Sequence, residues 1–405
     1  MMKNSWMKQA GLVLAAVLTA GAVWGTGYAP DVQAASSAFS DVKAGHWAES
    51  AIAKGVSKGY VDGYTNGTFK PDASVTRAEF VKMVVSAMKL ETKEASGKWY
   101  VPYVDAAASK GLYATSDFAN SEATWNKTMT REEMARVAAR AIGEKTSEND
   151  KWMYLATKEG LIKGMGKAQL APKGLTTRAQ SVVIIERILT SNAGGNLDSD
   201  LYATGAAEIM WHGTNIFTVM PEMFVTPESD WKNKGKTGIE DMWNEKNMTI
   251  TSKDGLYQAK LDALIAIDMA DPNDPNRALL GDINTLKWFN GNQMMKNPIK
   301  GNTNTYVIYF KSKQVFNKDR TRYVNRTFAQ FQVTGFGNVD GDAYAAGKLN
   351  KAAYVYRNQM GDVPAVIVPK SGTVQGMNDI SIVLQTPASG TWFKNVDLLR
   401  LRGIK

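Results

Sequence analysis

The chain has 405 residues, which is too long for one typical domain and predicts two or three. It carries 48 Lys and Arg against 39 Asp and Glu, a formal net charge of +9, and no dense basic run of the kind that marks a nucleic-acid-binding arm. This diffuse charge fits an anionic polymer or surface, or equally serves solubility. The absence of cysteine excludes disulfides, thiol catalysis and cysteine-ligated metal sites.

The first 34 residues have the pattern of a secretory signal peptide. Lys3 and Lys8 form a charged start, residues 11–25 are almost wholly apolar, and Val32-Gln33-Ala34 supplies the small residues that a signal peptidase reads. This pattern predicts export, with cleavage after Ala34 or one residue to either side and no membrane attachment afterwards. A retained membrane anchor is the weaker alternative, because the apolar run is shorter than the roughly 20 residues that a spanning helix needs.

A four-residue motif occurs three times between residues 38 and 192. Its copies are Thr76-Arg77-Ala78-Glu79, Thr130-Arg131-Glu132-Glu133 and Thr177-Arg178-Ala179-Gln180, each followed by an apolar helical pattern. The arginines lie 54 (131 − 77) and 47 (178 − 131) residues apart, so the repeat is near 50 residues. Each copy has the form of a capping box, in which Thr and the Glu or Gln three residues later satisfy the free backbone N–H groups of a helix start.

The capping box does not explain the arginine. A cation in the first turn of a helix faces the positive end of the helix dipole, which costs roughly 0.3–1 kcal/mol at an exposed site. An arginine beside a helix N-terminus makes a doubly positive pocket suited to a carboxylate or phosphate. We therefore predict anion sites at Arg77, Arg131 and Arg178. The alternative is three structural arginines, each paired with an acid or covering apolar surface.

The first repeat matches a known family pattern at many spaced positions. Residues 39–79 contain, in order, Phe-x-Asp-Val, His-Trp-Ala, Gly-Tyr-x-Asp-Gly, Gly-Thr-Phe-x-Pro and Thr-Arg-Ala-Glu. This order resembles the S-layer homology (SLH) domain. The second and third repeats are plainer but fall in register, which divides the region into 38–95, 96–144 and 145–192.

The resemblance implies an all-α bundle with pseudo-threefold symmetry. It also implies noncovalent binding of secondary cell wall polysaccharide, an acidic polymer with a pyruvylated amino sugar, in grooves between the repeats. The partners would then be this polysaccharide, the peptidoglycan-linked wall of a Gram-positive cell and other S-layer subunits, with no nucleic acid. The family's arginine falls on Arg77, Arg131 and Arg178, where it would meet the carboxylate.

Other candidate binding residues lie in the loops and at the starts of the short helices. They are Trp47, Trp99, Trp152, Asp62, Gly63 and Gly164. The three tryptophans are candidates to stack on sugar rings, with core packing as the alternative. Asp62 either bonds to sugar hydroxyls or stabilises its turn. The second repeat departs from the pattern, since Thr115 replaces the loop glycine and no proline precedes its Thr-Arg.

Residues 197–405 have a different character from the repeats. Asn192-Ala193-Gly194-Gly195-Asn196 predicts a short flexible linker. Strand patterns rich in β-branched and aromatic residues follow at 305–311, 322–334, 351–357, 363–368 and 380–384. Residues 257–269 alternate apolar and polar side chains and favour a strand over a helix. We predict one β-rich domain, sandwich or barrel-like, that resembles no family.

This half of the sequence contains no catalytic motif. His212 is its single histidine, and no Gly-x-Ser-x-Gly, His-Glu-x-x-His or phosphate-binding loop occurs. We therefore predict that the chain is not an enzyme and uses no cofactor or metal. The alternative is an SLH-anchored carbohydrate-active enzyme with two catalytic carboxylates in 197–405. Asp340 and Asp342 have the spacing of calcium ligands, but the loop lacks the later ligand positions and a turn is favoured.

Overall fold

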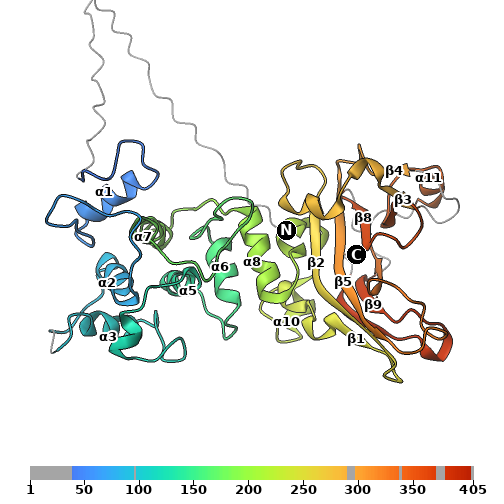
Figure 1. The fold of residues 1–405 in the computed structure, drawn as a ribbon, viewed down its shortest axis with the longest axis horizontal. Helices are drawn as coiled ribbons and strands as arrows, with labels where there is room; N and C mark the ends of the chain where they lie inside the picture. Colours follow the sequence, from blue (N-terminus) through green and yellow to red (C-terminus); the bar gives the residue numbers. More distant parts are fainter. Residues whose placement is uncertain (1–38, 95–96, 290–296, 337–339, 371–378, 403–405) are drawn as a thin grey trace, which may run out of the picture.

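The computed structural model describes residues 39–94, 97–289, 297–336, 340–370 and 379–402. Helices form the first part of this range and strands the second (Figure 1). The predicted signal peptide, residues 1–34, lies outside the described residues. Within the described ranges, no helix is both long enough and apolar enough to cross a lipid bilayer.

One hydrophobic core holds the helical part together, from Val42 to Trp211. Its helices are α1 (Glu49–Ser57), α2 (Arg77–Ala87), α3 (Val101–Ser109), α4 (Glu122–Trp125), α5 (Arg131–Ala141), α6 (Lys151–Lys158), α7 (Arg178–Asn192) and α8 (Leu201–His212).

The segments that precede α2, α5 and α7 hydrogen-bond to one another in a ring. The backbone N–H of Val75 donates to the carbonyl of Thr176 at 3.0 Å, that of Thr176 to Met129 at 2.9 Å, and that of Met129 to Val75 at 2.9 Å. Each repeat thus donates to one neighbour and accepts from the other, which is the pattern of a threefold axis. Because the three helices begin at this ring, the first residues of each helix lie beside the next repeat.

Each of these three helices begins with a complete capping box. The threonine hydroxyl accepts the backbone N–H three residues later, and the side chain of that later residue accepts the threonine N–H. The six bonds measure between 2.7 and 3.3 Å. The pairs are Thr76 with Glu79, Thr130 with Glu133 and Thr177 with Gln180.

Helix α8 continues the helical part into the range that the sequence analysis predicts to be β-rich. Asp200 caps its start by accepting the backbone N–H of Ala203 at 3.0 Å. Ala203, Ala207 and Trp211 are buried in the same core as the repeats. Their four-residue spacing is typical of one face of a helix. This helix could therefore have been predicted from the sequence.

The C-terminal part contains two antiparallel sheets, which confirms that it is β-rich. One sheet has the strand order β1-β2-β5-β8-β7-β3-β4 and the other β10-β9-β6. The strands are β1 (Thr249–Thr251), β2 (Tyr257–Asp268), β3 (Lys287–Phe289), β4 (Asn297–Pro298), β5 (Thr305–Asn317), β6 (Gln330–Thr334), β7 (Ala353–Tyr356), β8 (Ala365–Pro369), β9 (Ile380–Gln385) and β10 (Asn395–Leu401). Short helices α9 (Ile216–Val219), α10 (Glu228–Lys232) and α11 (Gly341–Ala345) lie between strands or before them.

The two sheets share a core. Phe310 of β5 stacks on Phe331 of β6 with ring centroids 3.8 Å apart. A second core covers the opposite face of the large sheet. Residues 257–268 form strand β2 as predicted. The apolar side chains of this strand do not all lie on the same face of the sheet. The register shifts between Leu261 and Ala263, so Leu261 enters the first core and Ala263 the second.

Candidate functional site

Three predicted binding residues from three different repeats meet at one pocket of about 220 Å³. Trp47 lies just before α1, Arg131 is the first residue of α5, and Gly164 lies in the loop after α6. The remaining lining residues are Ile162, Lys163, Met165, Gln180, Val183, Ile184 and Arg187. We call this pocket the Arg131 cleft.

The Arg131 cleft is cationic. Arg131, Lys163 and Arg187 line it, and none of its lining residues carries a carboxylate. Arg131 is only 4% exposed. Burial lowers the pKa of the guanidinium groups of Arg131 and Arg187, because a positive charge loses solvation there. An anion that enters this cleft would replace the lost solvation with an opposite charge.

Backbone carbonyl groups of the third repeat hold both arginines in place. Arg131 donates from Nε to the carbonyl of Leu170 at 2.9 Å and from Nη2 to that of Lys163 at 3.2 Å. Arg187 donates from Nη1 to the carbonyl of Leu161 at 2.9 Å. These bonds orient the side chains without neutralising their charge.

Arg178 meets the first repeat in the same way. It donates from Nε to the carbonyl of Phe69 and from Nη2 to that of Asp62, both at 2.8 Å. These two carbonyls hold the same positions in the first repeat as those of Leu170 and Lys163 in the third. We call the surroundings of this side chain the Arg178 site.

The Arg178 site is less positive than the Arg131 cleft. Asp62, Glu79 and Ser86 stand at the repeat positions of Lys163, Gln180 and Arg187. The side chain of Asp62 is exposed, so its carbonyl is the group that contacts Arg178. Trp99 is 49% exposed, and the Lys82 Nζ lies 6.0 Å from its ring centroid. The rings that contact the Arg178 guanidinium are those of Tyr64 and Phe69, with centroids 5.1 and 4.6 Å from Cζ.

Arg77 has a different environment. It matches the alternative given in the sequence analysis, in which the arginine is paired with an acid. It forms an ion pair with Glu133 of the second repeat, with Nε 3.1 Å from Oε2. Its Nη1 donates to the carbonyl of Thr124 at 3.0 Å, and its guanidinium lies 4.4 Å from the ring centroid of Phe118. The charge of Arg77 is thus balanced inside the protein.

The second repeat also neutralises its other arginines. Asp117 forms ion pairs with Arg136 at 3.1 Å and with Arg140 at 2.5 Å. Arg140 follows Arg131 by nine residues, as Arg187 follows Arg178, so it holds the place of Arg187 in its own repeat. The cations near Arg77 are therefore paired with acids, whereas within the described ranges no acid pairs with the cations that line the Arg131 cleft.

The structure separates Trp152 from the other two tryptophans. Trp47 is 62% exposed, whereas Trp152 is 4% exposed and lies in the core, with the Arg140 guanidinium 4.7 Å from its ring centroid. Trp152 is therefore a packing residue. Glu148 holds the position of Trp47 in the third repeat and accepts a hydrogen bond from Trp211 Nε1 at 2.7 Å.

The structure explains why glycine occupies the two predicted loop positions, Gly63 and Gly164. A Cβ at Gly63 would lie 2.0 Å from Cε1 of Phe39, so a side chain there would displace the aromatic ring. Gly164 donates its backbone N–H to Asp200 Oδ2 at 3.1 Å, which ties its loop to the start of α8. Both glycines fix the loops whose carbonyl groups hold the cleft arginines.

Sequence reasoning missed Lys163 and Arg187. Their signal is faint, because a basic residue before a loop glycine occurs only in the third repeat. The nine-residue spacing from Arg178 to Arg187 repeats that from Arg131 to Arg140, and could have identified Arg187.

Of the two possible calcium ligands, Asp340 caps a helix and Asp342 lies within it. Asp340 accepts the backbone N–H of Ala343 at 2.9 Å at the start of α11. Among the residues that the structure describes, no group of three or more acidic or histidine side chains is arranged to hold a metal ion.

Comparison with known proteins identifies the first repeat. The model of the S-layer homology domain matches residues 38–81, so the chain carries an SLH domain, as predicted. The exoglucanase XynX of Acetivibrio thermocellus is 30% identical over 213 residues, which cover 46% of this chain and 18% of that protein. The amylopullulanase of Thermoanaerobacterium thermosulfurigenes is 31% identical over 186 residues, 39% of this chain and 10% of the relative. The S-layer protein sap of Bacillus anthracis is 33% identical over 117 residues, which cover 27% of this chain and 14% of that protein.

These relatives overturn the prediction that the chain is not an enzyme. Two of them are named as an exoglucanase and an amylopullulanase, so similarity of this kind extends to carbohydrate-degrading enzymes as well as S-layer proteins. The missing catalytic motif is weak evidence, because a pair of catalytic carboxylates has no fixed sequence signature. The chain spans less than a fifth of the length of each of the three relatives, and its C-terminal half is not recognised.

Proposed function

We propose that residues 38–192 form three SLH repeats in a pseudo-threefold bundle that anchors the chain to the cell wall. The ligand is the acidic, pyruvylated secondary cell wall polysaccharide, bound in the Arg131 cleft and at the Arg178 site. One observation carries this proposal: three cations and an exposed tryptophan, supplied by all three repeats, line a cleft whose described lining has no carboxylate. The SLH match and the S-layer relative support a location at the wall.

The arrangement of Arg131 suits a carboxylate ligand. Two carbonyl groups fix Nε and Nη2, and Nη1 has no hydrogen-bond partner among the described residues. A pyruvyl carboxylate would meet a cation that is already oriented, so less conformational entropy is lost on binding. Trp47 offers a flat apolar surface to the adjoining sugar ring.

We propose further that the β-rich part is held against the third repeat and displayed at the cell surface. Lys151 of α6 pairs with Asp241 at 3.1 Å, and Lys158 pairs with Glu240 at 2.9 Å. Tyr154 donates its hydroxyl to Glu240 at 3.2 Å. These contacts, together with α8, support a firm connection in place of the predicted flexible linker at 192–196.

Sedimentation of the full chain with purified cell walls tests the anchoring function. We expect the chain to pellet with native walls and to stay in solution with walls stripped of pyruvyl groups. Arg131→Gln should shift most of the protein to the supernatant, whereas Arg320→Gln, which removes the same charge from an exposed site, should not. Equal binding to native and stripped walls would contradict the proposal.

The enzyme relatives favour a second candidate function, in which the anchored β-rich part acts on carbohydrate. Incubation of the full chain with a panel of wall and plant polysaccharides tests it. Release of reducing sugar that is lost when a pair of carboxylates is changed to amides would support this function. A complete absence of release across the panel would count against it.

A further inference from the structure

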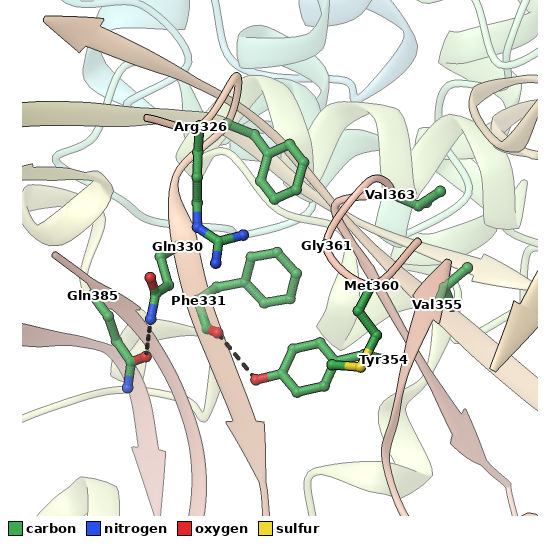
Figure 2. A pocket seen from close by; sticks show the side chains of 10 residues that line it. Arg326, Gln330, Phe331, Tyr354, Val355, Met360, Gly361, Val363 and Gln385 are labelled. Atoms are coloured by element: carbon green, nitrogen blue, oxygen red, sulfur yellow. Dashed lines mark hydrogen bonds between the residues drawn. The ribbon is translucent and has the colours of Figure 1, made fainter. Parts of the chain in front are cut away.

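A pocket of about 230 Å³ lies in the β-rich part, where the two sheets meet (Figure 2). It is lined from β6 and the segment before it, from β7 and the turn after it, and from the end of β9. The lining residues are Arg326, Phe328, Gln330, Phe331, Tyr354, Val355, Met360, Gly361, Val363 and Gln385. None of the roles proposed above uses these residues.

Arg326 is the single charged residue in this lining. Its Nε is buried without a hydrogen-bond partner, and no carboxylate within the described ranges pairs with its guanidinium. Figure 2 shows the guanidinium directed toward Gln330 and Phe331. Gly361 leaves it room, because a Cβ there would lie 2.9 Å from Nη1. A buried donor without a partner is unfavourable, and a ligand carboxylate would supply the missing acceptor.

Aromatic side chains form the walls beside this cation. The rings of Phe331 and Tyr354 lie with centroids 5.8 Å apart and an interplanar angle of 44°. Phe328 lies 6.3 Å from Phe331, and Tyr354 donates its hydroxyl to the carbonyl of Phe331 at 3.2 Å (Figure 2). Tyr354 remains 39% exposed and Met360 47%. Phe328 and Phe331 are buried at 8% and 6% exposure, so the ring of Tyr354 is the accessible aromatic surface that suits the flat face of a sugar ring.

A row of amide groups completes the polar side of the pocket. Gln330 donates from Nε2 to Gln385 Oε1 at 3.4 Å, and Gln385 donates from Nε2 to Gln332 Oε1 at 2.9 Å (Figure 2 shows the first bond). These bonds leave Gln330 Oε1 without a donor among the described residues. It is therefore available to accept a hydrogen bond from a ligand hydroxyl.

We propose that this pocket binds one carboxylate-bearing sugar residue. Its carboxylate pairs with Arg326, its ring lies against Tyr354 above the buried Phe331, and a hydroxyl donates to Gln330. The volume is below the roughly 300–1,000 Å³ of sites for drug-sized ligands, so the pocket takes a single ring. A uronic acid and a pyruvylated sugar share the required chemistry. This site is separate from the Arg131 cleft and the Arg178 site and does not depend on them.

Calorimetric titration tests the proposal, with Arg131→Gln and Arg178→Gln already present in the full chain so that the Arg131 cleft and the Arg178 site do not contribute. The probes are glucuronate, a methyl glucoside carrying a pyruvate ketal, and glucose as the neutral control. We expect at least one acid to bind at least tenfold more tightly than glucose. Hydrogen exchange should show protection at residues 326–331 and 354–363.

Variants of the pocket sharpen the result. Arg326→Gln should weaken acid binding at least tenfold. Arg326→Lys, which keeps the charge, should have an affinity between those of the unchanged chain and the Gln variant. Tyr354→Phe keeps the ring and should retain binding, whereas Tyr354→Ala should lose it; Arg320→Gln is the matched surface control. The proposal is overturned if both acids bind no better than glucose, if Arg326→Gln changes nothing, or if only a peptide with a C-terminal carboxylate binds. None of these results bears on wall anchoring.

Discussion

Arg131 and Arg77 begin equivalent helices with the same motif, yet they meet opposite surroundings. Carbonyl groups hold Arg131 beside two further cations, while Arg77 pairs with Glu133. The cause lies in the neighbouring repeat. Before α7 the chain turns through Ala171 at φ 46°, whereas before α5 it forms the short helix α4, and the carbonyl pattern changes with it. A repeated arginine therefore takes its role from the repeat it faces.

The largest effect is expected for wall binding when Arg131 is replaced. A hydrogen bond to a charged group contributes about 1.5–3 kcal/mol, which corresponds to about 10- to 100-fold in affinity. Arg131→Gln should lose this much in surface plasmon resonance on purified polysaccharide, Arg178→Gln less, and Arg77→Gln almost nothing. A comparable loss for Arg77→Gln would show that the three positions are equivalent after all.

Replacement of Arg77 should instead lower the stability of the fold. Arg77→Gln leaves Glu133 unpaired with its side chain only 15% exposed, so we expect a loss of about 1–3 kcal/mol in the free energy of unfolding. Glu133→Gln added to this variant should recover part of the loss while it keeps the capping acceptor. Urea unfolding measures both. An unchanged midpoint in the single variant would mean that the ion pair contributes nothing.

Gln180 offers a way to convert one site into the other. It lines the Arg131 cleft at the repeat position of Glu133. Gln180→Glu retains the capping box but puts a carboxylate near Arg131, so wall affinity should fall by roughly tenfold, the equivalent of about 1.4 kcal/mol. The isosteric Glu133→Gln at the Arg77 position is the control and should leave affinity unchanged. Undiminished binding by Gln180→Glu would refute the role of charge balance.

The smallest expected effect is a difference in acid sensitivity. Burial alone would raise the pKa of the Asp117 carboxyl, but hydrogen bonds from Arg140 and the backbone and the charges of Arg140 and Arg136 lower it overall. A carboxyl with a lowered pKa adds stability above its unfolded pKa of about 3.9, and this is lost as pH falls through the folded value. Asp117→Asn should flatten the fall in unfolding free energy below pH 4. An identical pH profile would contradict this.

Much of this arrangement follows from the sequence, because it depends on local spacing. The Thr-Arg motif predicts the helix starts at Thr76, Thr130 and Thr177, and alternation predicts strand β2. What the sequence does not supply is contact between distant residues. The pairing of Arg77 with Glu133 spans 56 residues. The helical spacing of Trp152 does not show whether its side chain is buried or exposed, because that depends on packing against other helices. Helix α8 in turn packs against the third repeat, which its own sequence does not reveal.

Hydrogen–deuterium exchange of the full chain, with and without purified pyruvylated polysaccharide, tests the central claim most directly. The account predicts protection at residues 46–48 and 161–165 around the Arg131 cleft, weaker protection at 61–64, and none at 114–118 beside Arg77. Protection centred on 114–118, or no protection in any of the three repeats, would contradict it.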